Sequence, residues 1–252
     1  MTRPAPPAAG RMTRLIRAEL FKAGANRATW ILAAIAPVFC VLWAVLIVAL
    51  APSSGPLPPE SVYNMAQQAY IFTLILGILG MSAEFRHQTI AWSFLVTPRR
   101  GAVVTAKLVA YGLIGLAVAV LSALATLAAG ASLLAVKGLP VMSPEVLPVL
   151  GGGALSTAGY AVLGVALAVL IRNQVAVIVL AALIFMYGDY LLSWLAPGVY
   201  PWLPTGAARA LGGLRLETGT LLPVWGGALL FAGYVAVIVL IARLITLRRD
   251  IT

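Results

Sequence analysis

The sequence of 252 residues contains one cysteine, Cys40, and one histidine, His87. A single thiol cannot form an internal disulfide, and neither residue type is present in the number that a metal cluster needs. Charged residues are scarce as well, at 10% of the chain against about 25% in average soluble domains. These shortages exclude the common thiol and metal chemistries, so Cys40 is interpreted as a small buried apolar side chain.

Three catalytic motifs are also missing. The sequence has no Gly-x-x-x-x-Gly-Lys-Ser/Thr phosphate loop, no His-Glu-x-x-His pair and no Gly-x-Ser-x-Gly turn. The first absence excludes the usual loop that cradles nucleotide phosphates, and the other two exclude familiar hydrolytic centres. We therefore expect no catalytic residue in this chain, no metal site and no bound cofactor.

Apolar residues are abundant instead, at 62% of the sequence. A soluble domain of this size cannot cover so much apolar surface, whereas a bilayer is a natural solvent for it. A spanning helix needs about 20 apolar residues. Six segments meet this requirement and predict an all-α membrane protein: 28–51, 61–84, 102–129, 147–171, 174–195 and 221–244. The first segment is too long for the apolar part of a signal peptide, so we expect it to remain in the protein.

The 17 basic residues give the chain a net charge of +10, but they are clustered rather than spread over one face. If the N-terminus is cytoplasmic, fourteen of them fall on the cytoplasmic side and only Lys137, Arg209 and Arg215 fall outside. This bias predicts that both termini are cytoplasmic. It also argues against nucleic acid as a partner, because a nucleic-acid groove would lie on a soluble body.

The residues before the first span have two distinct parts. Residues 1–10 are rich in proline and alanine and predict a disordered tail. Residues 11–27 predict an amphipathic helix in the membrane interface, with basic side chains, among them Arg14 and Lys22, opposite an apolar face. Glu19 falls on the apolar face and therefore suggests a specific basic partner. The alternative for this segment is a generic positively charged flank.

The segment between the second and third spans is too polar to cross the membrane and too apolar for an ordinary loop. Two sets of apolar residues recur at helical spacing, either Ile90, Phe94 and Leu95 or Trp92, Leu95 and Val96. We expect a short helix over 89–96, ended by Thr97 and Pro98. Exposed aromatic side chains need a surface to cover them, which is either the membrane interface or a protein partner.

The order of residues in this region resembles the permease subunits of ABC-2-type transporters. The resemblance rests on an acidic residue that closes the second span, a short apolar helix, a Thr-Pro-Arg-Arg sequence and a lysine that opens the third span. Glu19-Leu20-x-Lys22 before the first span and the interrupted loop before the sixth also match. In that loop, residues 207–216 are amphipathic and predict a short external or re-entrant helix. The matching residues of the loop between the second and third spans are Glu84, Thr89, Leu95, Pro98, Arg99, Arg100 and Lys107.

The resemblance implies a role for each of these segments. Residues 11–27 would be the elbow helix, and the loop would contain a coupling helix that enters a cleft of a separate ATPase. The coupling set would be Glu84, Phe85, Arg86, Thr89, Ile90, Trp92, Phe94, Leu95, Pro98, Arg99 and Arg100. Glu84 and Arg86 would hold one end of this helix through salt bridges. Arg99, Arg100 and Lys107 would hold the other end at the lipid headgroups. The alternative is a basic loop that merely snorkels.

A few polar side chains interrupt the spans. Asp189 lies within the fifth span, where a carboxylate is costly and usually faces a cavity or a partner. It could pair with Arg209 or Arg215, line an exit path for a cationic substrate, or reach the external headgroups. Asn64, Gln67 and Tyr160 could line the same pathway. Small residues at four-residue spacing, such as Gly164 and Ala168, predict close helix packing within one subunit or between subunits.

The sequence and the resemblance together predict a transport permease of the bacterial cytoplasmic (inner) membrane. Its partners would be two copies of an ABC ATPase, which bind ATP and Mg²⁺, together with a second permease chain, identical or related, and membrane lipid. The cargo would be a drug, a peptide antibiotic or a lipid. The alternative function is a non-transporting scaffold or sensor subunit that recruits a cytoplasmic partner.

Overall fold

The computed structural model describes residues 8–51, 57–86, 100–213 and 221–248. All regular elements in these ranges are helices, and six helical stretches are long and apolar enough to cross a membrane. They are Arg27–Leu50, Pro59–Arg86, Gly101–Val136, Val146–Leu170, Gln174–Leu195 and Val224–Thr246. These stretches confirm the prediction of an all-helical protein with six candidate spans.

The first two helices are joined by a short hydrogen-bonded turn. Helix α1 (Ala8–Ala25) is followed after one residue by α2 (Arg27–Leu50). The side chain of Asn26 caps α2 by accepting a hydrogen bond from the backbone N–H of Ala28, at 3.0 Å. The indole N–H of Trp30 donates to the carbonyl of Gly24 at 2.7 Å and ties the first turn of α2 to the last turn of α1.

The second span combines three elements, which are α3 (Pro59–Tyr63), the 3₁₀-helix η1 (Asn64–Ala69) and α4 (Tyr70–Arg86). The third span is α6 (Arg100–Val136), which is longer than the predicted 102–129. At 37 residues and about 1.5 Å per residue it measures about 55 Å, well beyond the ~30 Å hydrocarbon core. Gly138 follows it with a φ of 68°, a conformation that commonly ends helices.

The second half of the chain begins with α7 (Val146–Leu170). The fifth span consists of α8 (Gln174–Ala182), the π-helix η2 (Leu183–Gly188) and α9 (Asp189–Leu195). Two short helices, η3 (Tyr200–Trp202) and α10 (Pro204–Leu211), precede the sixth span, α11 (Val224–Arg248). A short helix was predicted around 207–216, and α10 overlaps the first half of that range.

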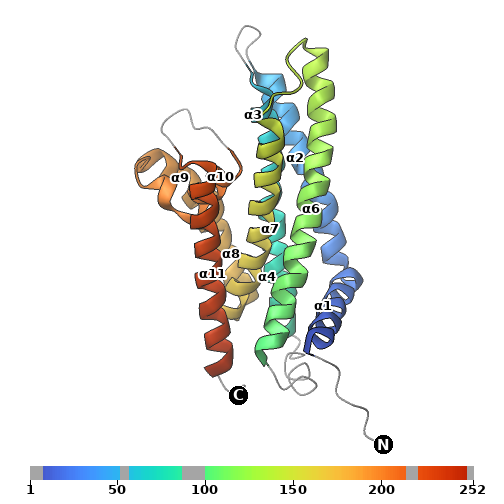
Figure 1. The fold of residues 1–252 in the computed structure, drawn as a ribbon, viewed down its shortest axis with the longest axis vertical. Helices are drawn as coiled ribbons and strands as arrows, with labels where there is room; N and C mark the ends of the chain where they lie inside the picture. Colours follow the sequence, from blue (N-terminus) through green and yellow to red (C-terminus); the bar gives the residue numbers. More distant parts are fainter. Residues whose placement is uncertain (1–7, 52–56, 87–99, 214–220, 249–252) are drawn as a thin grey trace, which may run out of the picture.

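The helices form an elongated bundle in which the start of α1 and the end of α11 lie at the same end (Figure 1). Helix α7 lies in its middle, where it packs against α4, α6 and α11. The main core cluster accordingly draws side chains from α4, α6, α7, α8 and α11. Cys40 is buried in a smaller cluster between α2, η1, α4 and α6, as the sequence predicted.

Helices α4 and α7 approach each other through glycines. A Cβ atom at Gly77 would lie 2.1 Å from the carbonyl oxygen of Ala161, and one at Gly164 would lie 2.1 Å from that of Leu74. Such small residues allow two helix backbones to come into direct contact, which stabilises helix pairs in lipid. The small-residue pattern around Gly164 therefore serves packing within one subunit.

Large apolar side chains remain exposed over α2, the fifth span and α11. Examples are Trp30, Val38, Trp194 and Trp225, which are exposed by 66%, 68%, 77% and 69%. A soluble protein would not present this much apolar surface to water. The exposed faces suit a lipid environment, in agreement with the six spans.

Candidate functional sites: a polar pocket and a buried ring of charges

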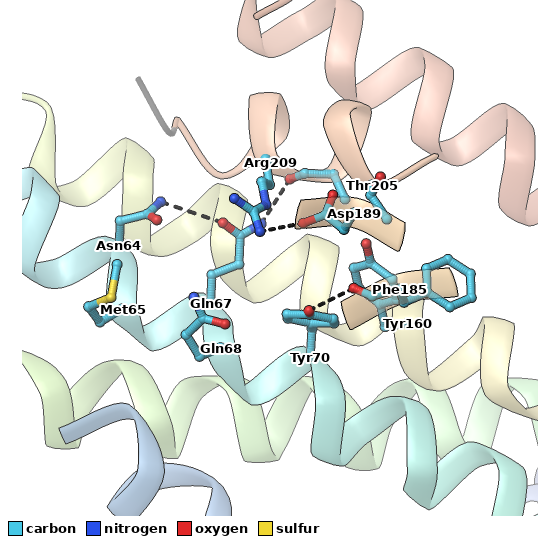
Figure 2. Close-up of a pocket in the computed structure, with 11 residues that line it drawn as sticks. Asn64, Met65, Gln67, Gln68, Tyr70, Tyr160, Phe185, Asp189, Thr205 and Arg209 are labelled. Carbon is cyan, nitrogen blue, oxygen red and sulfur yellow. Dashed lines mark hydrogen bonds and ion pairs between the residues drawn. The ribbon is translucent and has the colours of Figure 1, made fainter. Parts of the chain in front are cut away.

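A small pocket lies between η1, α7, the fifth span and α10, near the end of the bundle that carries α9 and α10 (Figures 1 and 2). Its volume is about 70 Å³, which is room for a few water molecules. The four residues predicted to line a pathway all lie on its wall. The full lining is Asn64, Met65, Gln67, Gln68, Tyr70, Tyr160, Phe185, Asp189, Thr205, Ala208 and Arg209.

Asp189 is paired within the protein. Its side chain is 2% exposed, the hydroxyl of Tyr200 donates to one carboxylate oxygen at 2.8 Å, and the guanidinium of Arg209 binds the other. Burial raises the pKa of the Tyr200 hydroxyl above its ordinary value, so this group stays protonated and donates. Of the three alternatives for Asp189, pairing with Arg209 is confirmed and exposure at the headgroups is wrong. Arg215 lies outside the described residues.

The π-helix brings an aromatic cluster to the same pocket. A π turn leaves backbone groups without their usual helical partners. Here the hydroxyl of Tyr70, at the start of α4, donates to the carbonyl of Phe185 within the π turn at 2.9 Å. The ring of Tyr160 packs between those of Tyr70 and Phe185, with centroid distances of 4.8 and 5.6 Å. The fifth span is thereby fixed to α4 and α7 at its irregular turn.

Asn64 and Gln67 hold α10 in place. The amide of Asn64 donates to the carbonyl of Gly212 at 3.0 Å, and that of Gln67 donates to the carbonyl of Ala208 at 2.8 Å and to the hydroxyl of Ser156 at 2.7 Å. These bonds hold the C-terminal end of α10, where the carbonyl of Ala208 also accepts from the backbone N–H of Gly212 at 3.1 Å. The geometry thus gives both amides a structural task as well as a place on the pocket wall.

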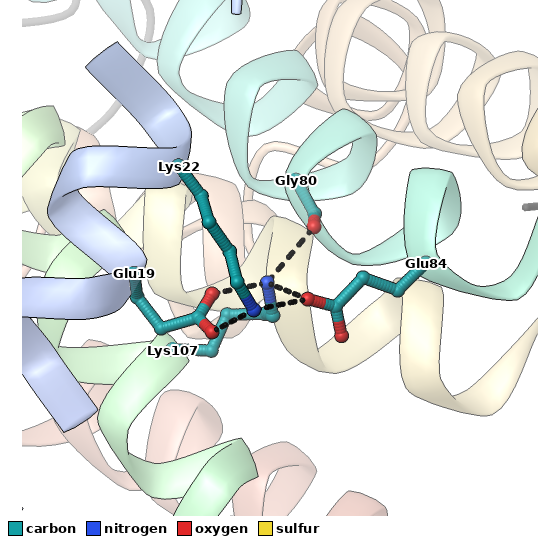
Figure 3. A network of polar contacts seen from close by, with 5 residues as sticks. All are labelled: Glu19, Lys22, Gly80, Glu84 and Lys107. Carbon is teal, nitrogen blue, oxygen red and sulfur yellow. Dashed lines mark hydrogen bonds and ion pairs between the residues drawn. The ribbon is translucent and has the colours of Figure 1, made fainter. Parts of the chain in front are cut away.

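A second constellation lies at the other end of the bundle, where α1, α4 and α6 meet (Figures 1 and 3). The carboxylate of Glu19 binds Lys22 at 2.7 Å and Lys107 at 2.5 Å. The carboxylate of Glu84 binds the same two amines, at 3.2 and 3.1 Å. We call these four residues the charge ring, since acidic and basic groups alternate around a closed cycle. Glu19 thus has the basic partners that its position on the apolar face predicted.

Lys107 is the most deeply buried member of the charge ring. Its side chain is 3% exposed, against 49% for Lys22. Its ammonium group contacts both carboxylates and also donates to the carbonyl of Gly80 at 3.1 Å, so its three protons have partners. The expectation that Lys107 reaches the lipid headgroups is wrong, because it lies on the face of α6 that packs against α1 and α4.

Two members of the charge ring, Glu19 and Lys22, are held in their charged forms by their ring partners. Burial works against the ionised form of Glu19, but Lys107 and Lys22 outweigh burial and hold its pKa below the ordinary value. Burial likewise opposes the charge of Lys22, and its bonds to Glu19 and Glu84 raise its pKa above the ordinary value. The lowered pKa of Glu19 gives stability that is lost only as the solution becomes acidic, and the raised pKa of Lys22 gives stability that is lost only at alkaline pH.

We therefore expect the contribution of Glu19 and Lys22 to the attachment of α1 to be independent of pH between about 5 and 10, the interval between the ordinary pKa values of glutamate and lysine. Amide exchange of α1, corrected for the intrinsic effect of pH on the exchange rate, measures this directly. A corrected rate in α1 that rises several-fold between pH 7 and pH 5.5 would contradict the assignment.

The structure covers only part of the predicted coupling set. Thr89, Ile90, Trp92, Phe94, Leu95, Pro98 and Arg99 lie outside the described residues, and so does the predicted helix over 89–96. Glu84, Phe85 and Arg86 form the last turn of α4, and Arg100 begins α6. The guanidinium of Arg172 lies 5.7 Å from the ring centroid of Phe85, which joins α4 to the turn after α7.

Helix α1 has the amphipathic character that was predicted. Leu15, Ile16 and Leu20 are half-buried, whereas Arg14 is exposed. The helix packs against α6 and α2. The helix begins at Ala8, so residues 8–10 are helical.

The sequence analysis missed the structural roles of two residues, Lys107 in the charge ring and Tyr200 beside Asp189. Lys107 was assigned to the headgroups, although a lysine two turns into a span already indicates an internal partner. Tyr200 carried no signal, because it lies in a proline-interrupted segment whose path the sequence does not define. Arg209 was considered only as one of two partners for Asp189.

Six apolar helices, exposed apolar faces and internally paired charges define a multi-pass helical membrane protein. A family model described as ABC-2 family transporter protein matches residues 15–188, so the chain belongs to this family. Membership makes it a transmembrane component without its own nucleotide-binding domain and implies partnership with an ABC ATPase. No curated protein matches the chain. The matched range includes the whole charge ring but ends one residue before Asp189.

Proposed function

We propose that this protein is the permease subunit of an ABC exporter of the bacterial inner membrane, with both termini in the cytoplasm. The family match over residues 15–188 carries the proposal. The six candidate spans support it, as does the position of the start of α1 and the end of α11 at one end of the bundle. The distribution of lysine and arginine favours the cytoplasm for that end.

The segment between α4 and α6 is proposed to be the docking element for the ATPase. Residues 85–98 include Trp92 and Phe94, and buried aromatic anchors commonly dominate protein interfaces. Two ATPase subunits, each with ATP and Mg²⁺, would bind a pair of permease chains. Closure of the ATPases would then push on this segment and move the spans, which carries cargo outward.

The cargo is proposed to be hydrophobic or amphipathic, such as a drug, a peptide antibiotic or a lipid. The pocket at Asp189 is too small to hold it in the described conformation, because pockets for drug-sized ligands measure about 300–1,000 Å³. Cargo would therefore pass when the helices around the pocket separate, or along the face shared with a second permease chain. The exposed apolar side chains of α2 and α11 could form this contact with a second permease chain.

The test is to co-express the tagged protein with candidate ABC ATPases and to isolate the complex from membranes. We expect an ATPase to co-purify and its hydrolysis rate to change when the permease is present. Trp92→Ala together with Phe94→Ala should weaken this complex by roughly 30-fold or more, because aromatic anchors contribute about 2 kcal/mol or more. Binding is measured by titrating the ATPase onto the permease in lipid nanodiscs.

The matched control removes two exposed aromatic rings elsewhere, with Trp194→Ala in α9 and Trp225→Ala in the first turn of α11. It should leave the affinity for the ATPase unchanged. Failure of any ATPase to bind the wild type would leave the scaffold or sensor function as the better explanation. An unchanged affinity of the Trp92/Phe94 variant would show that docking occurs elsewhere.

A further inference from the structure

The charge ring connects three helices through one buried ammonium group. Lys107 lies on α6, and its ammonium contacts Glu19 of α1 as well as Glu84 and the carbonyl of Gly80 on α4 (Figure 3). Glu84 precedes residues 87–99 by three positions, and Lys107 follows them by eight. The ring therefore lies at both ends of the segment that joins α4 to α6, and it holds them to α1.

Packing beside the charge ring keeps α4 and α6 in contact. A Cβ atom at Gly80 would lie 1.9 Å from the ring of Tyr111, so only glycine admits this tyrosine against α4. The ammonium of Lys107 lies 5.7 Å from the centroid of the same ring. The hydrogen bond from Lys107 to Gly80 thus forms where the two helices already touch.

The other end of α1 is fixed to the first span. The backbone N–H of Asn26 donates to the carbonyl of Ala23 at 3.1 Å, and Trp30 donates to the carbonyl of Gly24, so two hydrogen bonds join the start of α2 to the end of α1. A displacement of α1 must therefore reach the start of α2. The charge ring and this joint form a continuous path from α4 and α6 to the first span.

Opening the charge ring is costly. Two acidic and two basic groups cancel each other, and three of the four side chains are at most 10% exposed. Separating such groups leaves buried charges without partners, which is strongly unfavourable. The helices that carry the ring are therefore expected to move together rather than to slide past one another.

We infer that the charge ring makes α1 a positioning element: it fastens α1 to both helices that flank residues 87–99, so that movement of that segment is passed to α1 and the first span. Glu19 and Lys107 act here as positioning residues. The inference rests on the proposed function in one respect, since the force that moves the segment would come from the ATPase. The fastening itself is a property of this chain alone.

The test uses Glu19→Gln combined with Lys107→Met. This pair removes one negative and one positive group, keeps the net charge, and leaves Lys22 facing Glu84 at 3.2 Å. It breaks the ion pair that joins α1 to α6. In lipid nanodiscs without ATPase, we expect amides of α1 to exchange about tenfold faster or more, and those of α7 to be unchanged. In the ATPase complex, binding should persist while the permease no longer alters the hydrolysis rate.

The matched control is Arg17→Gln with Glu145→Gln, which removes the same two charges from exposed positions. It should behave like the wild type in both measurements. Glu19→Asp provides a second variant if the double variant does not fold. It keeps every charge but withdraws the carboxylate by one methylene group, so a smaller acceleration of exchange is expected in α1.

Unchanged exchange in α1 would overturn the inference at its first step. Faster exchange with an unaltered effect on the ATPase would also overturn it, since the ring would then only stabilise the fold. A third outcome is that α1 exchanges faster in the double variant while the wild-type protein binds no ATPase. It would support the fastening of α1 and count against the proposed function.

Discussion

Replacing Gly164 with leucine is expected to destabilise the folded bundle by about 3 kcal/mol or more, because overpacking here cannot be relieved by a side chain. A Cβ atom at this position would lie 2.1 Å from the carbonyl oxygen of Leu74 and 3.0 Å from the backbone nitrogen of Ile78. Both are backbone atoms of α4, so α4 and α7 would have to separate. Their interface is the most extensive in the bundle.

Thermal unfolding in detergent, followed by size-exclusion chromatography, measures this effect. The control is Gly151→Leu, also in α7, where an added Cβ atom meets nothing within 4 Å. It adds the same leucine to an open surface and should leave the midpoint of unfolding nearly unchanged. Equal midpoints for the two variants would show that α4 and α7 do not approach as closely as described.

Asp189→Ala is the substitution with the second largest expected effect, a loss of about 3 kcal/mol. It leaves the Arg209 guanidinium and the Tyr200 hydroxyl without their acceptor, and the carboxylate it removes is 2% exposed. The side chain of Arg209 is 31% exposed and can recover some hydration, which places the loss at the lower end of the range for buried ion pairs.

The same unfolding experiment checks this expectation, together with amide exchange of α10, which carries Arg209. Exchange in α10 should rise, whereas exchange in α1 should not, because the charge ring lies at the other end of the bundle. Glu145→Ala serves as control, since Glu145 is an exposed carboxylate. An Asp189 variant as stable as this control would mean that the Arg209 pair contributes nothing to the fold.

The six spans could be predicted because each needs only length and apolar composition, and lipid imposes both. The predicted boundaries lie within a few residues of the observed ones, except at the end of α6. The prediction stopped at residue 129, where the apolar core was expected to end. The helix continues to Val136 because alanine and leucine favour helix in water as well, and it ends only near Gly138.

The candidate sites were predicted in part. Asn64, Gln67, Tyr160 and Asp189 were selected because polar side chains are costly within a membrane, and the fold brings all four to one pocket. Their partners were not predicted, because a partner depends on which helices become neighbours. Lys107 shows the same limit: its burial follows from the packing of α1 against α6, and no local pattern encodes that contact.

The π turn in the fifth span has a consequence for comparison with relatives. A π turn corresponds to one residue inserted into an α-helix, and each residue of an α-helix turns the chain by about 100°. Because the wider π turn absorbs the inserted residue, deleting one residue between Leu183 and Gly188 would restore a regular helix and leave Asp189 facing Arg209. An aligned gap of one position in this turn would therefore be compatible with an acidic residue that keeps the register of Asp189.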